Sequence, residues 1–292
     1  MAAGRNAPQP ADGLAVDHAS LEQAALWYAT LRAETVGDAE RRAWQAWLAQ
    51  SPLHARAWAH IEAVGRRFEP LRAGGADAAL AGAPGGADGG DAGEQREIVL
   101  DDGSRVWLNT GSALDAEFAA DRRRLLLHAG EILVETAADR FRRPFWVDTA
   151  DGRMQALGTR FAVCLSAGRT RLDVFDGAVR VRNQAGAVLQ VRAGEHTVFD
   201  ADGLGRVDAA DPAREAWSRG LVVADGITLA ELVAELARYR RGHLGVAPAV
   251  AGLKVVGVFP AQDPERALAM LEAALPLRVQ RTLPWWVSLE PR

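Results

Sequence analysis

Short apolar runs separated by polar turns dominate the middle third of the chain, between residues 95 and 200. Runs of this length, punctuated by glycine and aspartate, are typical of strands in an antiparallel sheet. Residues 101–104 (DDGS) and 176–177 (DG) lie where hairpin turns favour residues that tolerate a positive φ. The pattern predicts an antiparallel all-β domain, with strands expected at 97–100, 106–108, 131–134, 145–147, 161–163, 172–174, 179–181 and 188–191.

Residues 20–69 have helical periodicity instead and predict a small unit of three short helices. Ser20 and Gln23 have the spacing of a capping box for the first helix, and Asp38 is placed to cap the second. Ser51 followed by Pro52 favours the start of the third helix, because proline suits the first helical position. The recurring apolar positions are Leu21, Ala24, Tyr28 and Leu31, then Trp44, Trp47 and Leu48, then Trp58, Ile61 and Val64.

Strand and helix patterns alternate in the last part of the chain, residues 217–292. Thr228 and Glu231 have the spacing of a capping box, and Asp263 followed by Pro264 favours a second helix start. The resulting β-α-β-β-α-β order is a split βαβ unit, so the whole chain is predicted to be a multi-domain α+β protein. Its expected strands lie at 220–223, 243–246, 253–259 and 286–289.

Two segments lack any pattern of packed structure. Residues 1–19 are rich in alanine, glycine and proline without the apolar core of a signal peptide, so we expect a disordered lead that begins in the cytoplasm. Residues 70–94 form a Gly/Ala/Asp linker that contains Pro84 and charges such as Asp77 and Asp88. A membrane-spanning helix needs about 20 mainly apolar residues. The residues therefore predict a soluble chain without a transmembrane segment.

Composition limits the chemistry. The 292 residues carry a net charge of −4, so no basic field favours nucleic acid and we expect no direct nucleic-acid partner. Cys164 is the single cysteine, which excludes an intramolecular disulfide and a multi-cysteine metal site. Histidine spacing, phosphate loops and nucleophile motifs give no metal, cofactor or enzyme signal. An alternative that fits this composition is a soluble carbohydrate- or ligand-binding β-domain protein.

The succession of motifs in residues 95–200 resembles the FecR family of bacterial sigma-factor regulators. The resemblance implies that the chain relays the loading state of a TonB-dependent outer-membrane transporter, of the siderophore or iron type, to an extracytoplasmic-function sigma factor. The motifs, in order, are 100–110 (LDDGSRVWLNT), 123–125 (RRL), 128–131 (HAGE), 143–147 (RPFWV), 157–161 (LGTRF), 175–179 (FDGAV) and 192–195 (RAGE).

The helical residues 20–69 resemble the cytoplasmic N-terminal domain of the same family, through 24–27 (AALW), 47–54 (WLAQSPLH) and 57–58 (AW). The resemblance implies that this domain holds the sigma factor. Four of the nine tryptophans lie here, and they are either core residues or an exposed hot-spot face that a unit this small cannot bury. The expected sigma-factor-binding residues are Trp27, Leu31, Trp44, Trp47, Leu48 and Trp58.

The C-terminal region, residues 217–292, resembles the short domain at the N-termini of secretins and TonB-dependent transducers. This likeness implies contact with the signalling domain of such a transducer. Relatives also carry one inner-membrane helix before a periplasmic C-terminal part, and residues 70–94 depart from that pattern because they offer no apolar span.

Gly158 and Thr159 stand where the family resemblance marks a possible self-cleavage point. In an N–O acyl shift the threonine hydroxyl attacks the preceding carbonyl carbon, and water then hydrolyses the ester. Gly158 suits this step because it has no Cβ to block the attack and accepts strained φ/ψ. The alternative is a tight glycine turn between two strands, with Thr159 facing solvent.

Overall fold

A computed structural model describes residues 17–32, 36–68, 88–89 and 93–292. The chain divides into two compact units, Met1–Ala81 with Gln280–Ser288, and Gly82–Val279 with Leu289–Arg292. Within the described residues, no helix is both long and apolar enough to cross a membrane. Most of the linker expected at 70–94, and most of the lead expected at 1–19, lie outside the described residues.

Three helices form the N-terminal part, α1 (His18–Leu31), α2 (Asp38–Gln50) and α3 (Pro52–Phe68). The first helix begins earlier than the capping box at Ser20 predicts, because the Asp17 carboxylate accepts the Ser20 backbone N–H at 2.8 Å and caps the helix. Gly37 is the cap of α2, and Asp38 stands inside its first turn, where a negative charge favours the helix dipole. The predicted start of α3 is confirmed, since Ser51 Oγ accepts the Leu53 N–H at 3.2 Å.

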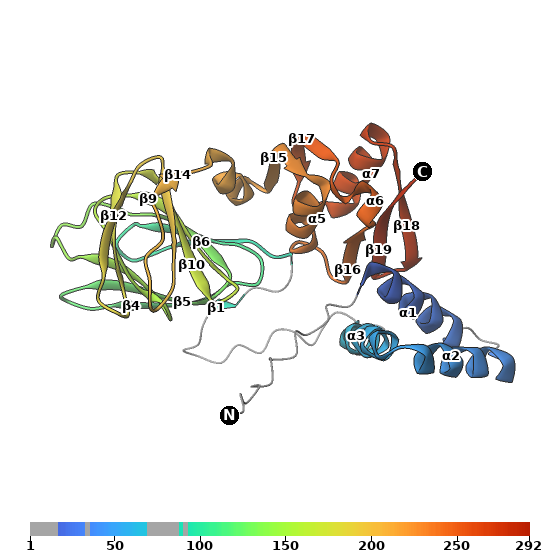
Figure 1. The fold of residues 1–292 in the computed structure, drawn as a ribbon. Coiled ribbons are helices and arrows are strands. Elements are labelled where there is room, and N and C mark those ends of the chain that lie inside the picture. The colour runs from blue at the N-terminus through green and yellow to red at the C-terminus, as the bar shows by residue number, and fades with distance from the viewer. Residues whose placement is uncertain (1–16, 33–35, 69–87, 90–92) are drawn as a thin grey trace, which may run out of the picture. The chain divides into compact units, whose positions relative to one another are not determined.

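The middle of the chain is a sandwich of two seven-stranded sheets, seen as two facing layers in Figure 1. The pairs are antiparallel except β5 with β7. One sheet has the order β1 (Asp88–Gly89), β4 (Ala113–Phe118), β5 (Arg123–Ala129), β7 (Phe145–Thr149), β8 (Gly152–Ala156), β11 (Ala178–Asn183) and β12 (Val188–Arg192). The other has β14 (Asp208–Ala209), β13 (Glu195–Phe199), β10 (Arg169–Asp176), β9 (Arg160–Ser166), β6 (Glu131–Glu135), β3 (Arg105–Leu108) and β2 (Arg96–Val99).

Side chains from the inner faces of both sheets share one apolar core. Leu125, Phe145 and Met154 of the first sheet and Ile132 and Phe161 of the second are at most 1 % exposed. Alternate residues of each strand point into this core, which is the period-2 pattern of a two-layer β fold. The predicted antiparallel all-β domain is confirmed.

The C-terminal part begins with a 3₁₀ helix, η1 (Pro212–Arg219). The predicted strand and helix order is present, with the helix α6 and the strand β18 added. The Thr228–Glu231 capping box and the Asp263 cap are both formed. Two small sheets result, β15–β17 and β16–β19–β18. The elements are β15 (Leu221–Thr228), α5 (Leu229–Ala237), β16 (His243–Val246), α6 (Pro248–Ala251), β17 (Lys254–Pro260), α7 (Pro264–Ala274), β18 (Leu277–Leu283) and β19 (Trp286–Pro291).

Candidate functional site

The helical unit gathers the aromatic residues that the sequence singles out. Trp47 is 8 % exposed and stacks on His54 with ring centroids 4.5 Å apart. Trp44 and Trp58 are half-buried, and their ring centroids lie 5.0 Å apart. The remaining predicted residues, Trp27, Leu31 and Leu48, are half-buried as well. One indole is therefore core, whereas three keep part of their surface open to solvent.

A small surface hollow of about 190 Å³ lies beside these rings. Leu31 lines it together with Tyr28, Arg32 and Trp58. The Arg32 guanidinium lies 4.5 Å from the centroid of the Tyr28 ring, a cation–π arrangement. Leu31 and Trp58 thus come together at the surface, although they lie on different helices.

Two further tryptophans belong to this unit and were not expected there. Trp286 is fully buried in the same core cluster as Tyr28 and Trp47. Trp285 packs edge-on against Tyr28, with centroids 5.4 Å apart. The Ser288 hydroxyl also donates to the Glu22 carboxylate at 2.8 Å. Two adjacent tryptophans near the end of the sequence indicate that this segment packs into a core. The sequence does not show which core, because their partners on the helices lie more than 200 residues away in the chain.

The Gly158–Thr159 bond lies in the turn between β8 and β9. Gly158 has φ +82°, a conformation that favours glycine, and Thr159 is 4 % exposed. Thr136 holds the turn from the side: its Oγ1 accepts the Thr159 N–H at 2.8 Å, and its own N–H donates to the Thr159 carbonyl at 3.0 Å. The threonine is therefore fixed inside the domain rather than facing solvent.

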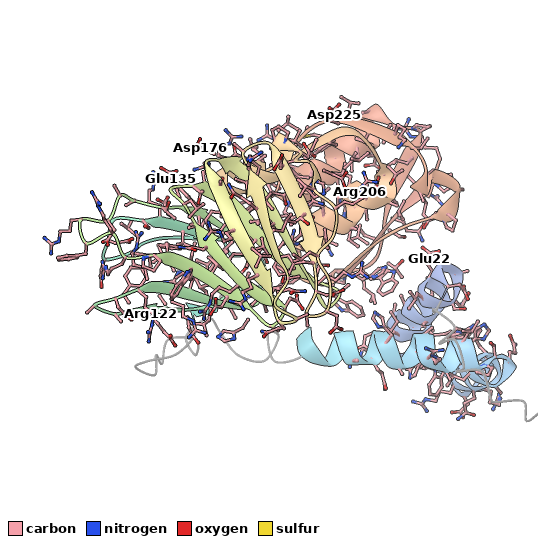
Figure 2. All side chains as sticks on the ribbon, turned by 60° about the vertical axis from the view of Figure 1, so that its left-hand side comes forward. Glu22, Arg122, Glu135, Asp176, Arg206 and Asp225 are labelled. Atoms are coloured by element: carbon pink, nitrogen blue, oxygen red, sulfur yellow. The ribbon has the colours of Figure 1, made fainter. Side chains whose placement is uncertain are left out.

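The nucleophilic atom of this turn is buried and unengaged. Within the described part of the chain, Thr159 Oγ1 has no hydrogen-bond partner. Gly177 approaches the Gly158 carbonyl oxygen so closely that a Cβ at position 177 would collide with it. Figure 2 shows Glu135 and Asp176 at one end of the sandwich, and both are register partners of Arg160, the residue after Thr159. Glu135 is held by Arg160 at 2.6 Å.

Comparison with known proteins decides what this architecture is. Residues 90–180 match the family model described as FecR protein, and residues 22–64 match a model described as a domain of unknown function, DUF4880. Residues 90–180 are therefore a FecR domain. The FecR match covers the strands from β2 into β11, and the Gly158–Thr159 turn lies within it.

The fold of this FecR protein also occurs in solved structures. Two crystal structures of a candidate anti-sigma factor from Parabacteroides distasonis align with TM-scores of 0.57 and 0.56, each at 20 % identity. The alignments cover 70 % of this chain in both cases, and 99 % and 98 % of the two solved chains. No curated protein matches the chain significantly in sequence.

A buried ionic cluster joins the FecR sandwich to the following α/β part inside one compact unit. The Glu131 side chain is 2 % exposed, accepts from Arg238 at 2.9 Å and from Asn109 Nδ2 at 2.9 Å, and lies 3.9 Å from Arg214. Burial lowers the pKa of Arg238, but the charges of Glu131 and Glu235 outweigh it and hold that pKa above its ordinary value. The sequence contained Glu131 in the HAGE motif, yet nothing local identified its cationic partner.

Proposed function

We propose that this FecR protein regulates an extracytoplasmic-function sigma factor, and that its N-terminal helices, the region expected at 20–69, bind that factor. The observation that carries the proposal is the presence of the FecR and DUF4880 matches in one chain. The shared fold with a candidate anti-sigma factor supports it.

The half-buried indoles support this assignment physically. Trp27, Trp44 and Trp58 pack against the helical core and are half-buried, so part of each side chain stays accessible. Leu26 is 45 % exposed on the same first helix as Trp27. Rigid aromatic anchors of this kind contribute most of the binding energy in protein interfaces, and truncating a central one typically costs about 2 kcal/mol or more.

The α/β part, expected at 217–292, is proposed to contact the signalling domain of a TonB-dependent outer-membrane transducer. β15 and β17 form a two-stranded sheet, so each has an edge that another strand could extend. β17 also presents apolar side chains, with Val256 77 % and Val258 50 % exposed. Such a contact requires this part to reach the periplasm, which cell fractionation with an antibody against residues 217–279 tests.

Gly158 and Thr159 are proposed as a single-turnover cleavage point. Thr159 Oγ1 would attack the Gly158 carbonyl carbon, forming an ester while the peptide C–N bond breaks and the Thr159 nitrogen becomes a free amine. Water would then hydrolyse the ester to a Gly158 carboxylate and restore the Thr159 hydroxyl. The burial of Thr159 and its unengaged hydroxyl support this reading over a merely solvent-facing turn.

A binding experiment tests the sigma-factor role and separates it from the alternative of a ligand-binding β-domain protein. The full chain is immobilised and challenged with each extracytoplasmic-function sigma factor of its own organism. The double variant Trp44→Ala/Trp58→Ala should weaken binding at least 30-fold, which corresponds to about 2 kcal/mol. Trp107→Ala is the matched control, because Trp107 is also half-buried but lies on β3 of the FecR domain. Absence of any binding by the folded full chain would contradict the proposal.

A further inference from the structure

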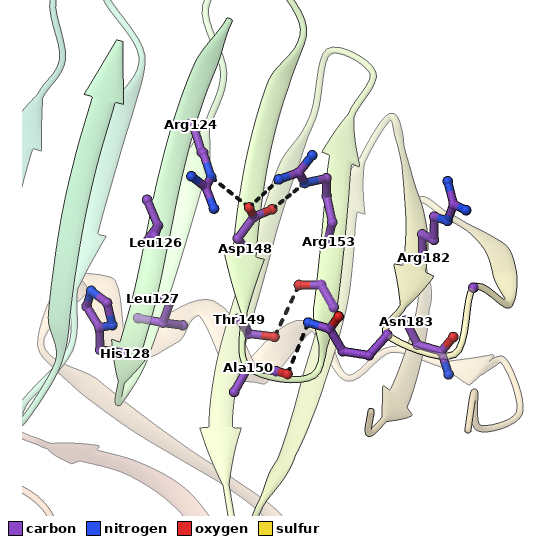
Figure 3. Close-up of a pocket in the computed structure, with 13 residues that line it drawn as sticks. Arg124, Leu126, Leu127, His128, Asp148, Thr149, Ala150, Arg153, Arg182 and Asn183 are labelled. Carbon is purple, nitrogen blue, oxygen red and sulfur yellow. Dashed lines mark hydrogen bonds and ion pairs between the residues drawn. The ribbon is translucent and has the colours of Figure 1, made fainter. Parts of the chain in front are cut away.

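A polar pocket of about 620 Å³ lies on the sheet formed by β5, β7, β8 and β11, and its lining includes none of the residues of the sites described above. Figure 3 shows its lining: Arg124 and Arg153 converge on Asp148, while Arg182 and Asn183 stand on the neighbouring strand. Its volume falls in the range of pockets that hold small ligands, about 300–1,000 Å³. The side chains here are mainly hydrogen-bond donors, which sets the chemistry of a possible occupant.

Positive charge exceeds negative charge in this pocket. Asp148 accepts from Arg124 at 2.7 Å and from Arg153 at 2.8 and 2.7 Å, so one carboxylate already serves two guanidinium groups. Arg182 is the third guanidinium, and among the described residues it has no hydrogen-bond or ion-pair partner. Asp148 is the single anionic residue of the lining, and Glu117 also pairs with Arg124 at 3.0 Å, so the three guanidinium groups exceed the two carboxylates by one charge.

The third arginine, Arg182, lies where a like charge on the neighbouring strand repels it. Arg182 lies directly opposite Arg153 in the β8–β11 pairing. Like charges opposite one another on adjacent strands destabilise a sheet. Arg153 is held in place both by Asp148 and by the Trp146 ring, whose centroid lies 4.7 Å from its guanidinium. An anion bound between the two arginines would relieve their repulsion.

We propose that this pocket binds a small ligand through an anionic oxygen group, a phosphate or a carboxylate, held by Arg182 and Arg153. The planar guanidinium fork matches the geometry of both groups. The half-buried Leu126 lines the other side of the pocket and suits a ligand with a non-polar portion beside its charge. This site is separate from the sigma-factor role, and neither requires the other.

Titration calorimetry on the full chain tests the site, with pyrophosphate, succinate and phosphatidylglycerol vesicles as three separate probes. We expect saturable binding of at least one probe, and the responding probe shows whether the group is a free phosphate, a carboxylate or a lipid headgroup. Arg182→Ala should weaken that binding at least tenfold.

Arg180→Ala is the matched control. Arg180 lies two residues before Arg182 on the same strand and the same face, and it is also exposed, but it does not line the pocket. Binding to Arg180→Ala should stay within twofold of the original chain. Equal losses in Arg180→Ala and Arg182→Ala would show a diffuse charge effect and overturn the proposal, as would the absence of saturable binding by all three probes. Circular dichroism of each variant verifies that the fold is intact.

Discussion

Removing the cation beside the buried Glu131 carboxylate should destabilise the protein strongly. In Arg238→Ala the carboxylate loses its closest ion-pair partner, at 2.9 Å, and stays 2 % exposed to solvent. Breaking a buried ion pair by removing one partner typically costs about 3–5 kcal/mol, because an uncompensated charge remains. Asn109 still donates to Glu131, and Arg214 lies 3.9 Å away, so the lower end, about 3 kcal/mol, applies.

Urea unfolding followed by circular dichroism measures this loss. With a typical slope of about 2 kcal/mol per molar urea, a loss of about 3 kcal/mol lowers the midpoint by about 1.5 M. Arg206→Ala is the control, because the Arg206 and Asp208 side chains of that ion pair are 86 % and 49 % exposed. An exposed pair contributes about 0–1 kcal/mol, so the control midpoint should move by less than about 0.5 M.

A second variant separates the loss of charge from the loss of packing. In Arg238→Ala combined with Glu131→Gln no buried charge is left uncompensated, so the double variant should recover at least half of the lost stability. A midpoint for Arg238→Ala that matches Arg206→Ala would refute the reasoning. So would a double variant less stable than Arg238→Ala, because Glu131 would then not be the source of the cost.

Three further predictions follow from the same structure. Burial raises the pKa of Asp102, but hydrogen bonds from Ser104 and Arg123 outweigh it and hold that pKa below its ordinary value. The contribution of Asp102 to the free energy of unfolding is therefore complete above about pH 4 and is lost as the pH falls below that. In Asp102→Asn the free energy of unfolding should fall less steeply with decreasing pH in this range. Burial raises the pKa of Cys164 to about 11, so iodoacetamide at pH 8 should modify the native thiol about a hundredfold more slowly than the urea-unfolded one, and equal rates would contradict this. Purified protein should separate on a denaturing gel into two fragments, one ending at Gly158 and one beginning at Thr159, whereas Thr159→Ala should stay uncut. A single uncut chain after long incubation would contradict cleavage and would mean that Gly158 and Thr159 form only a structural turn.

Local signals predicted element starts well and long-range packing poorly. The Thr228–Glu231 box and the Ser51–Pro52 start were readable because both partners lie within three residues of each other. Strands β4, β5, β8 and β13 were missed. In β4 and β8 the outward positions are polar or charged, as in Asp115 and Arg153, and each strand has few apolar residues to mark it.

The same limit applies to the sites. The aromatic residues of the helical unit could be selected from composition and spacing, but their burial could not, because Trp285 and Trp286 reach that unit from the other end of the chain. The pocket beside Arg182 had no sequence signal, since its cations belong to three strands and only the register of β8 with β11 brings Arg153 and Arg182 opposite each other.

The most direct test of the central claim is calorimetric titration of the chain with each extracytoplasmic-function sigma factor of its own organism. The account predicts a complex with one sigma factor per chain and a dissociation constant below about 1 µM, which corresponds to more than about 8 kcal/mol of binding free energy. It also predicts that a chain lacking residues 20–69 gives no heat of binding. Binding that persists without those residues would contradict the proposed role of the helical unit. A folded chain that binds no sigma factor would contradict the proposal that this protein regulates one.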